Sequence, residues 1–123
     1  MLKRLLVVDD EPAILETTRF ILENEGFEVT TAPDGLAALE ALARSRPDAV
    51  LLDLMMPGLD GYATCRRIRE DVQLQGLPVA VLTARWQRDE LDKALAAGAD
   101  ALLRKPLDEA ALFEFLRKAN AGA

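Results

Sequence analysis

Five side chains that could do chemistry stand where short apolar runs of the sequence end: three carboxylates, one hydroxyl and one amine. They are Asp9, Asp10, Asp53, Thr83 and Lys105. Two unit charges 4 Å apart repel by about 4 kcal/mol at an effective dielectric constant of 20, so three carboxylates in one cleft require a proton or a divalent cation. Oxygen ligands suit Mg²⁺, which retains water and favours phosphate oxygens.

The same side chains fit the transfer of a phosphoryl group. Asp53 can be the nucleophile, because carboxylates form aspartyl phosphates. Lys105 supplies a fixed positive charge and Thr83 a hydroxyl donor, and both stabilise a transferring phosphoryl group. The chain has no His and a single Cys, which excludes Ser-His-Asp and Cys-His catalysis, a Cys/His zinc site and an internal disulfide.

Five segments predict the strands that would position these residues. Residues 5–8, 49–52 and 79–82 are continuous apolar runs, typical of central strands covered on both faces in a parallel sheet. Residues 27–31 and 99–104 contain polar residues and are expected at the two edges.

The order of these strands decides which side chains meet. In the order 2-1-3-4-5 the first and third strands are neighbours, so we expect Asp9, Asp10 and Asp53 to converge. In open α/β sheets, ligands bind beyond the carboxyl ends of the strands, where the strand order reverses. The predicted site therefore lies at this edge of the sheet.

Five amphipathic helices are expected between and after the strands. The first helix is expected to begin at Pro12 and end at Gly26, and Asp34 is expected to cap the second. The third is expected from Asp60 to Asp71. The fourth is expected to start after Thr83 and stop at Gly98, and the fifth follows Leu107-Asp108. Their expected inward residues are Ile14, Thr17, Phe20 and Ile21; Ala38, Leu39 and Leu42; Cys65 and Ile68; Leu91 and Leu95; and Leu112, Phe115 and Leu116. This alternation predicts an α/β fold with a doubly wound five-stranded parallel sheet and right-handed crossovers.

Composition fits one globular domain over residues 1–123. The chain is 50% hydrophobic and 29% charged, which supplies enough apolar surface for a core and excludes a disordered chain. No apolar run approaches the roughly 20 residues of a membrane span, and the first run is too short for a signal peptide, so we expect a cytoplasmic protein without membrane contact. The net charge of −6 argues against direct nucleic-acid binding.

Four motifs, in this order, resemble those of the receiver domains of response regulators in two-component signalling, a family that includes chemotaxis regulators. They are Val8-Asp9-Asp10-Glu11, Leu52-Asp53-Leu54-Met55-Met56-Pro57-Gly58-Leu59-Asp60-Gly61, Leu82-Thr83-Ala84 and Lys105-Pro106. The resemblance spans essentially the whole chain and implies a flavodoxin-like fold.

The resemblance also implies a role for each matching residue. Asp53 would be the phosphoacceptor, Asp10 would bind Mg²⁺ directly and Asp9 through water, and the backbone carbonyl of Met55 would be a further ligand. Lys105 would pair with the phosphoryl group, and Thr83 would move to hydrogen-bond it.

The implied function is a signalling switch that catalyses only its own phosphorylation and dephosphorylation. The donor would be a phosphohistidine of a sensor histidine kinase or a histidine phosphotransfer protein. The output would be altered affinity for an effector protein or domain, through the fourth helix, fifth strand and fifth helix, with phosphorylation-dependent dimerisation left open.

One position departs from the family pattern. Receivers commonly hold Tyr or Phe three residues before the lysine, where Leu102 stands here, so the usual aromatic read-out is in doubt. Met55 and Arg85 flank the site and are expected to influence the lifetime of the phosphoryl group. Trp86 lies between Thr83 and the fourth helix, and we expect it to report on the modification through its fluorescence.

Alternatives remain for the separate residues and for the whole chain. Asp9 and Asp10 could favour a helix N-terminus, Asp53 could be a turn residue, Thr83 a helix cap and Lys105 a surface side chain. A dehalogenase-like phosphatase would need an acid where Met55 stands, and a flavodoxin would need a phosphate loop that is not acidic. A receiver-like interaction module that takes no phosphoryl group stays open.

Overall fold

The computed structural model describes residues 3–84, 87, 89–105 and 107–121. Five strands are formed: β1 (Arg4–Val8), β2 (Glu28–Ala32), β3 (Ala49–Asp53), β4 (Val79–Thr83) and β5 (Ala101–Arg104). The helices are α1 (Pro12–Asn24), α2 (Gly35–Arg44), α3 (Gly61–Glu70), the short 3₁₀ helix η1 (Val72–Leu74), α4 (Glu90–Ala96) and α5 (Glu109–Ala121). None of the described helices combines the length and apolar character needed to span a bilayer.

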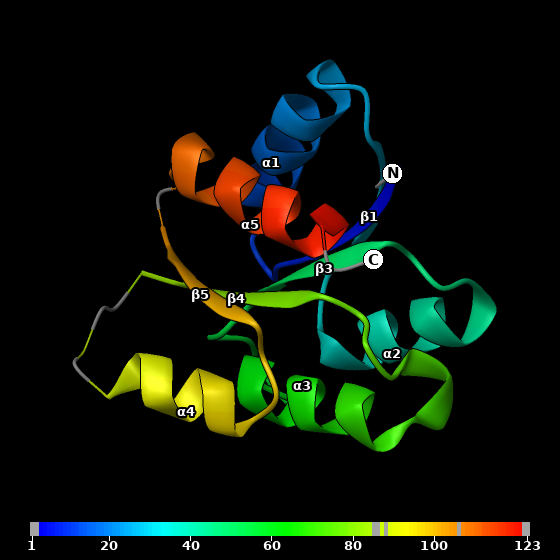
Figure 1. The fold of residues 1–123 in the computed structure, drawn as a ribbon, viewed down its shortest axis with the longest axis vertical. Helices are drawn as coiled ribbons and strands as arrows, with labels where there is room; N and C mark the ends of the chain where they lie inside the picture. Colours follow the sequence, from blue (N-terminus) through cyan, green and yellow to red (C-terminus); the bar gives the residue numbers. More distant parts are fainter. Residues whose placement is uncertain (1–2, 85–86, 88, 106, 122–123) are drawn as a thin grey trace.

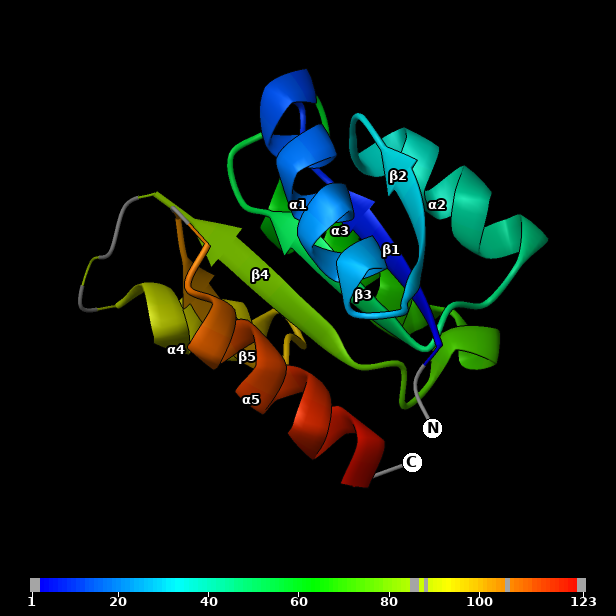
Figure 2. The ribbon, with the colours of Figure 1, turned by 90° about the horizontal axis from the view of Figure 1, so that it is seen from above.

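All five strands run parallel in the order β2-β1-β3-β4-β5, as predicted (Figure 2). Helices α1 and α5 cover one face of the sheet, and α2, α3 and α4 cover the other (Figures 1 and 2). Because β1 and β3 are neighbours, their carboxyl ends lie side by side. The chain therefore forms the doubly wound architecture with a reversal of strand order at β1.

Alternate residues of each central strand feed two separate cores. In β1, Leu6 and Val8 pack with the layer of α2, α3 and α4, whereas Leu5 and Val7 pack with the layer of α1 and α5. The same alternation holds in β3 and β4. Strands that are buried on both faces read as continuous apolar runs, which explains why the three central strands could be recognised in the sequence.

The helix boundaries follow the expected signals in three places. Asp34 caps α2 by accepting a hydrogen bond from the backbone N–H of Ala37 at 2.8 Å, and Asp60 caps α3 in the same way through Ala63. Gly26 has φ of 96° after the last turn of α1, a left-handed conformation that favours glycine.

Two expected inward faces are wrong. In α1, Thr18 and Leu22 are buried, while Phe20 is 66% exposed.

Helix α4 begins at Glu90 rather than directly after Thr83, so Thr83 is the last residue of β4 and not a helix cap. Leu91 and Leu95 are exposed, because the side of α4 that faces the molecule contains Glu90 and the small Ala94 instead.

Candidate functional site

Three carboxylates meet at the carboxyl ends of the two central strands. Asp9 directly follows β1, and its backbone N–H still donates to the carbonyl of Ala32 in β2 at 3.1 Å. Asp53 is the last residue of β3. One carboxylate oxygen from each of Asp9, Asp10 and Asp53 lies within 4.8 Å of the others, so the convergence expected from the strand order is confirmed.

Lys105 bridges two of these carboxylates. Its Nζ atom lies 2.7 Å from Oδ2 of Asp9 and 3.0 Å from Oδ1 of Asp53. The side chain of Lys105 is 12% exposed, and those of Asp9 and Asp53 are 2% and 4% exposed. The backbone N–H of Lys105 donates to the carbonyl of Thr83 at 2.8 Å, which ties the end of β5 to the end of β4.

Burial determines the electrostatics of this cluster. Burial raises the pKa of Asp53 from 3.8 to about 6; the hydrogen bond from Lys105 acts in the opposite direction, and the charge of Asp9 adds to the increase. The pKa of Lys105 is raised: burial opposes the increase, but the hydrogen bonds to Asp9 and Asp53 outweigh burial. A single ammonium group therefore compensates three carboxylates only in part.

Local turns hold the acidic side chains in place. The Oδ1 atom of Asp9 accepts a hydrogen bond from the backbone N–H of Glu11 at 2.9 Å, which orients its carboxylate just before α1. The loop after β3 closes where the N–H of Gly61 donates to the carbonyl of Leu54 at 2.9 Å. An added Cβ at Gly61 would lie 2.6 Å from the carbonyl oxygen of Asp53, so this close approach requires glycine.

The remaining predicted residues border the cluster or lie outside the described residues. Thr83 is 1% exposed at the end of β4, and Met55 is 59% exposed in the loop after Asp53. The expectations for Arg85 and Trp86, and for the proline of the Lys105-Pro106 motif, fall outside the described residues. Leu102 is 8% exposed in the core on the α3 and α4 side of the sheet.

The donor set fits a hard divalent cation. Oxygen atoms of three carboxylates within 4.8 Å of one another match the ligands that Mg²⁺ prefers. Asp10 is exposed, whereas Asp9 and Asp53 are buried, so the cluster is open to solvent on one side. A cation that keeps part of its water needs this opening.

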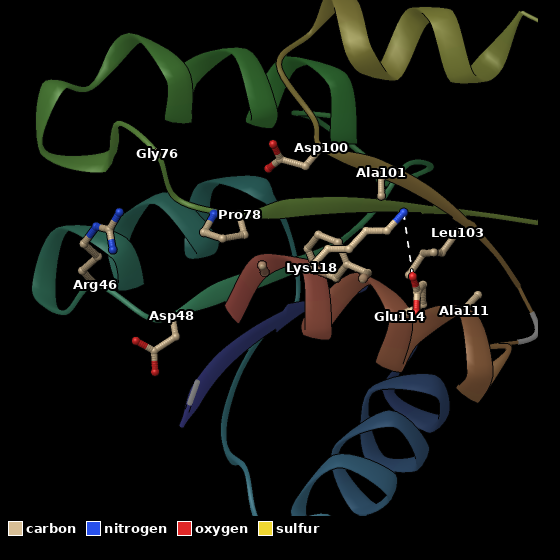
Figure 3. A pocket seen from close by; sticks show the side chains of 12 residues that line it. Arg46, Asp48, Gly76, Pro78, Asp100, Ala101, Leu103, Ala111, Glu114 and Lys118 are labelled. Atoms are coloured by element: carbon tan, nitrogen blue, oxygen red, sulfur yellow. Dashed lines mark ion pairs between the residues drawn. The ribbon is translucent and has the colours of Figure 1, made fainter. Parts of the chain in front are cut away.

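A cavity lies at the other end of the sheet. It has a volume of about 690 Å³ and lies beside the amino ends of β4 and β5 and the last turns of α5 (Figure 3). Pro78, Asp100 and Ala101 line one side, and Glu114 and Lys118 of α5 form an ion pair at 3.9 Å on the other. It is separated from the carboxylate cluster by the length of the strands, so it is not part of the candidate site.

Sequence reasoning missed three contacts that shape this region. It placed Lys105 against a phosphoryl group and did not predict its pairing with Asp9 and Asp53. The close approach of Gly61 to Asp53 and a hydrogen bond between Tyr62 and Glu90 were also missed. The glycine in the loop motif was the one available signal, since side-chain pairing across distant segments leaves no local pattern.

The fold and this cluster together match one known family. The family model for the response regulator receiver domain matches residues 5–117. The chain belongs to the response regulator receiver domain family, whose members act as signalling switches in two-component systems and bind Mg²⁺ at an acidic cluster.

Curated relatives and solved structures agree with this assignment. The chain is 46% identical over 112 residues to the transcriptional regulatory protein CseB of Streptomyces avermitilis, covering 91% of the chain and 46% of that relative. It is 47% identical over 118 residues to the response regulator MprA of a Mycobacterium species, covering 96% and 49%. The chain thus spans about half the length of these relatives.

The solved structures agree over almost the full length of both chains. The chemotaxis protein CheY4 of Vibrio cholerae superposes with a TM-score of 0.89 at 28% identity, covering 97% of this chain and 99% of that one. A CheY-like receiver domain protein of Methanospirillum hungatei has a TM-score of 0.88 at 30% identity, covering 99% and 97%.

Proposed function

We propose that this receiver domain, over residues 1–123, accepts a phosphoryl group on Asp53 from a phosphohistidine of a sensor histidine kinase or a histidine phosphotransfer protein. The observation that supports this most strongly is the group of Asp9, Asp10, Asp53 and Lys105 at one edge of the sheet. A nucleophilic carboxylate, further oxygen ligands and a fixed ammonium group are what phosphoryl transfer to an aspartate requires.

In the reaction, a carboxylate oxygen of Asp53 forms a bond to phosphorus while the bond from phosphorus to the donor imidazole nitrogen breaks. The imidazole leaves and takes up a proton from solvent. Lys105 stabilises the negative charge on the phosphoryl oxygens, and the hydroxyl of Thr83 donates a hydrogen bond to one of them. Attack of water on the aspartyl phosphate reverses the modification and releases inorganic phosphate.

Mg²⁺ would be held by Asp10 and Asp53, by Asp9 through water, and by the backbone carbonyl of Met55. When bound, the cation neutralises charge that develops on the phosphoryl oxygens. Asp10 is the exposed member of the cluster, which suits a ligand that meets an incoming hydrated ion.

The output is a changed affinity for an effector protein or domain at the surface of α4, β5 and α5. This surface contains the exposed apolar side chains Leu91 and Leu95, and the charged side chains Glu114, Arg117 and Lys118 lie on α5. Exposed leucines between charged residues are suited to a partner or to a phosphorylation-dependent dimer. The relative CseB is named a transcriptional regulatory protein, and we propose a cytoplasmic role of this regulatory kind here, with no direct nucleic-acid contact by the receiver domain itself.

The test is phosphorylation by a small donor. Incubation with acetyl phosphate and Mg²⁺ should add one phosphoryl group, detected by intact mass and released by hydroxylamine, because acyl phosphates react with it. Asp53→Asn should remove the labelling, whereas Asp60→Asn, the same change at a helix cap where Asn serves equally well, should retain it. Absence of labelling in the unmodified sequence would favour the interaction module that takes no phosphoryl group.

A further inference from the structure

A hydrogen bond joins the first turns of α3 and α4. The hydroxyl of Tyr62 donates at close range to the carboxylate of Glu90 and lies 3.5 Å from the carbonyl oxygen of Glu90. Tyr62 is half-buried, and Glu90 is 9% exposed. Burial and this carboxylate raise the pKa of Tyr62 far above its usual value, so the hydroxyl remains a donor throughout the physiological pH range.

This hydrogen bond holds the start of α4, while Arg69 holds its end by donating from Nε to the carbonyl of Gly98 at 2.7 Å. The buried residues of α4 are Glu90 and Ala94, followed by Ala97 at the C-cap, whereas Leu91 and Leu95 are 39% and 48% exposed. Two alanine side chains bury little apolar surface, because burial of apolar groups stabilises in proportion to their area. A hydrogen bond to a charged carboxylate is stronger than one between neutral groups, so its loss is expected to matter for the position of this short helix.

The two helices follow the two strands that end at the candidate site. Strand β3 ends at Asp53 and leads to α3, where Gly61, next to Tyr62, lies against the Asp53 carbonyl. Strand β4 ends at Thr83 and leads to Glu90 at the start of α4. The Tyr62–Glu90 bond thus connects the segments that leave Asp53 and Thr83.

The strand ends themselves are held by the sheet. Asp53 is paired with Leu82, and the N–H of Leu54 donates to the carbonyl of Leu82 at 2.8 Å. A group added to Asp53 enters the side of the cluster that is open to solvent, beside the segments that follow the strands. A change in the separation of these segments acts directly on the contact between the first turns of α3 and α4.

We propose that the Tyr62–Glu90 hydrogen bond holds α4 in its unmodified position and breaks when Asp53 is modified, which releases α4 and changes the surface around Leu91 and Leu95. This inference rests on the proposed function and adds the means of its regulation. It needs no aromatic side chain at Leu102, which is buried in the same core layer as α4. A ligand that favours the released state gains affinity when the bond is removed, because the two equilibria are linked.

The first measurement uses the fact that Tyr62 is the chain's single tyrosine. Tyrosine labelled with ¹³C at the ζ carbon gives one NMR signal, followed while beryllofluoride and Mg²⁺ are added. Occupancy of Asp53 is measured separately by ¹⁹F NMR of the bound fluoride. The tyrosine signal should shift in proportion to occupancy, and in Glu90→Met, which has no side-chain oxygen to accept the bond, it should already lie near its modified position.

The two possible failures are distinguishable. If no bound ¹⁹F signal appears, the proposed function is wrong. If the ¹⁹F signal appears at full occupancy and the Tyr62 signal stays in place, the function stands and the role of this hydrogen bond is refuted.

The second measurement is the beryllofluoride dissociation constant of variants. Tyr62→Phe, which keeps the ring, and Glu90→Met, which keeps the side-chain length without an oxygen acceptor, should each bind about five- to tenfold more tightly, within the usual range of coupling between sites. Their double variant should show no further gain, because both changes remove the same contact. Asp92→Asn is the matched control, since it removes the same charge from the exposed side of the same helical turn and should leave the affinity unchanged. Unchanged or weaker binding in both single variants overturns the proposal.

Discussion

Lys105 is the positive charge between two carboxylates that are almost fully buried. Removing one partner of a buried ion pair leaves the other charge without compensation, which typically costs about 3–5 kcal/mol. We expect Lys105→Ala to lower the free energy of unfolding by about 3 kcal/mol in metal-free buffer. Mg²⁺ should restore part of this loss, because a cation supplies the missing positive charge.

Thermal denaturation with and without Mg²⁺ measures both effects. Lys93→Ala is the control, since Lys93 forms an exposed pair with Asp89 at 3.2 Å and exposed pairs contribute little. Equal melting temperatures for Lys105→Ala and Lys93→Ala would contradict the prediction.

Asp53 makes the stability of the metal-free domain depend on pH. Its pKa in the folded protein, about 6, lies above the ordinary value of 3.8, so the folded state binds the proton more tightly than the unfolded state. Stability contributed by that proton is present below about pH 4 and is lost as the pH rises through 6. Relative to Asp53→Asn, the unmodified protein should lose up to about 3 kcal/mol between pH 4 and pH 7.

Urea denaturation of both proteins in the presence of a chelator checks this. A stability difference between them that stays constant over this pH range would show that Asp53 is not perturbed as described.

Residue types and strand ends were sufficient to predict the convergence of Asp9, Asp10 and Asp53, because parallel strands bring their carboxyl ends to one edge. They were not sufficient for the bond between Lys105 and Asp9. That bond depends on the side-chain conformation of a lysine after β5, three strands from β1 in the sheet order, and no local pattern encodes it.

At the scale of elements, the start of α3 is positioned by a close backbone approach. Replacing glycine by alanine in a helix normally stabilises by about 1 kcal/mol. At Gly61 the added Cβ would meet the carbonyl oxygen of Asp53 at 2.6 Å and the Cα of Leu54 at 2.7 Å. We expect Gly61→Ala to destabilise the domain by about 1–3 kcal/mol and to weaken beryllofluoride binding by displacing the acceptor segment.

Gly35→Ala is the matched control for the binding measurement. The three atoms nearest to its Cβ would belong to Leu59 and Thr64, whereas the nearest atom at Gly61 belongs to Asp53. It should therefore destabilise the domain while binding beryllofluoride normally. Equal affinities for the two variants would show that Gly61 contributes only to stability.

Leu102 of β5 has a packing role at the position where an aromatic side chain was expected from the family pattern. It is 8% exposed in the core layer of α2, α3 and α4. Leu102→Ala should lower the free energy of unfolding by about 2–4 kcal/mol, as other buried leucine truncations do, and should leave the beryllofluoride-induced change intact. Circular dichroism in urea and the Tyr62 signal measure the two effects. Loss of the induced change in a folded Leu102→Ala would show that this side chain transmits it.

The helices show why an apolar pattern predicts some faces and fails on others. In α5, Leu112, Phe115 and Leu116 are buried as predicted. In α4 the largest apolar residues lie outside, and Glu90 lies inside, where it accepts a hydrogen bond from Tyr62. A prediction based only on the spacing of hydrophobic residues therefore orients such a helix with the wrong face toward the core.

At the scale of the whole molecule, a net charge of −6 is concentrated in part at one edge of the sheet. A divalent cation that binds only the folded state stabilises it by mass action. We expect 10 mM Mg²⁺, on the order of ten times a millimolar dissociation constant, to raise the free energy of unfolding by about 1.4 kcal/mol. Asp10→Ala should remove most of this increase while raising the stability of the metal-free domain.

Differential scanning fluorimetry with Mg²⁺ and after chelation checks both statements. Asp108→Asn, at an exposed position before α5, provides the comparison. If Mg²⁺ stabilises Asp10→Ala as much as the unmodified protein, the cation binds elsewhere.

The bridge from Lys105 to Asp9 and Asp53 also bears on how the chain folds during synthesis. Translation proceeds from the N-terminus, so β1 and β3 with their two carboxylates leave the ribosome well before Lys105 does. Until Lys105 is added, pairing β1 with β3 brings the carboxylates of this cluster together without the ammonium group that lies between Asp9 and Asp53 in the complete sheet. We therefore expect the pairing of β1 with β3 to be less stable in a partly synthesised chain, most of all when Mg²⁺ is scarce.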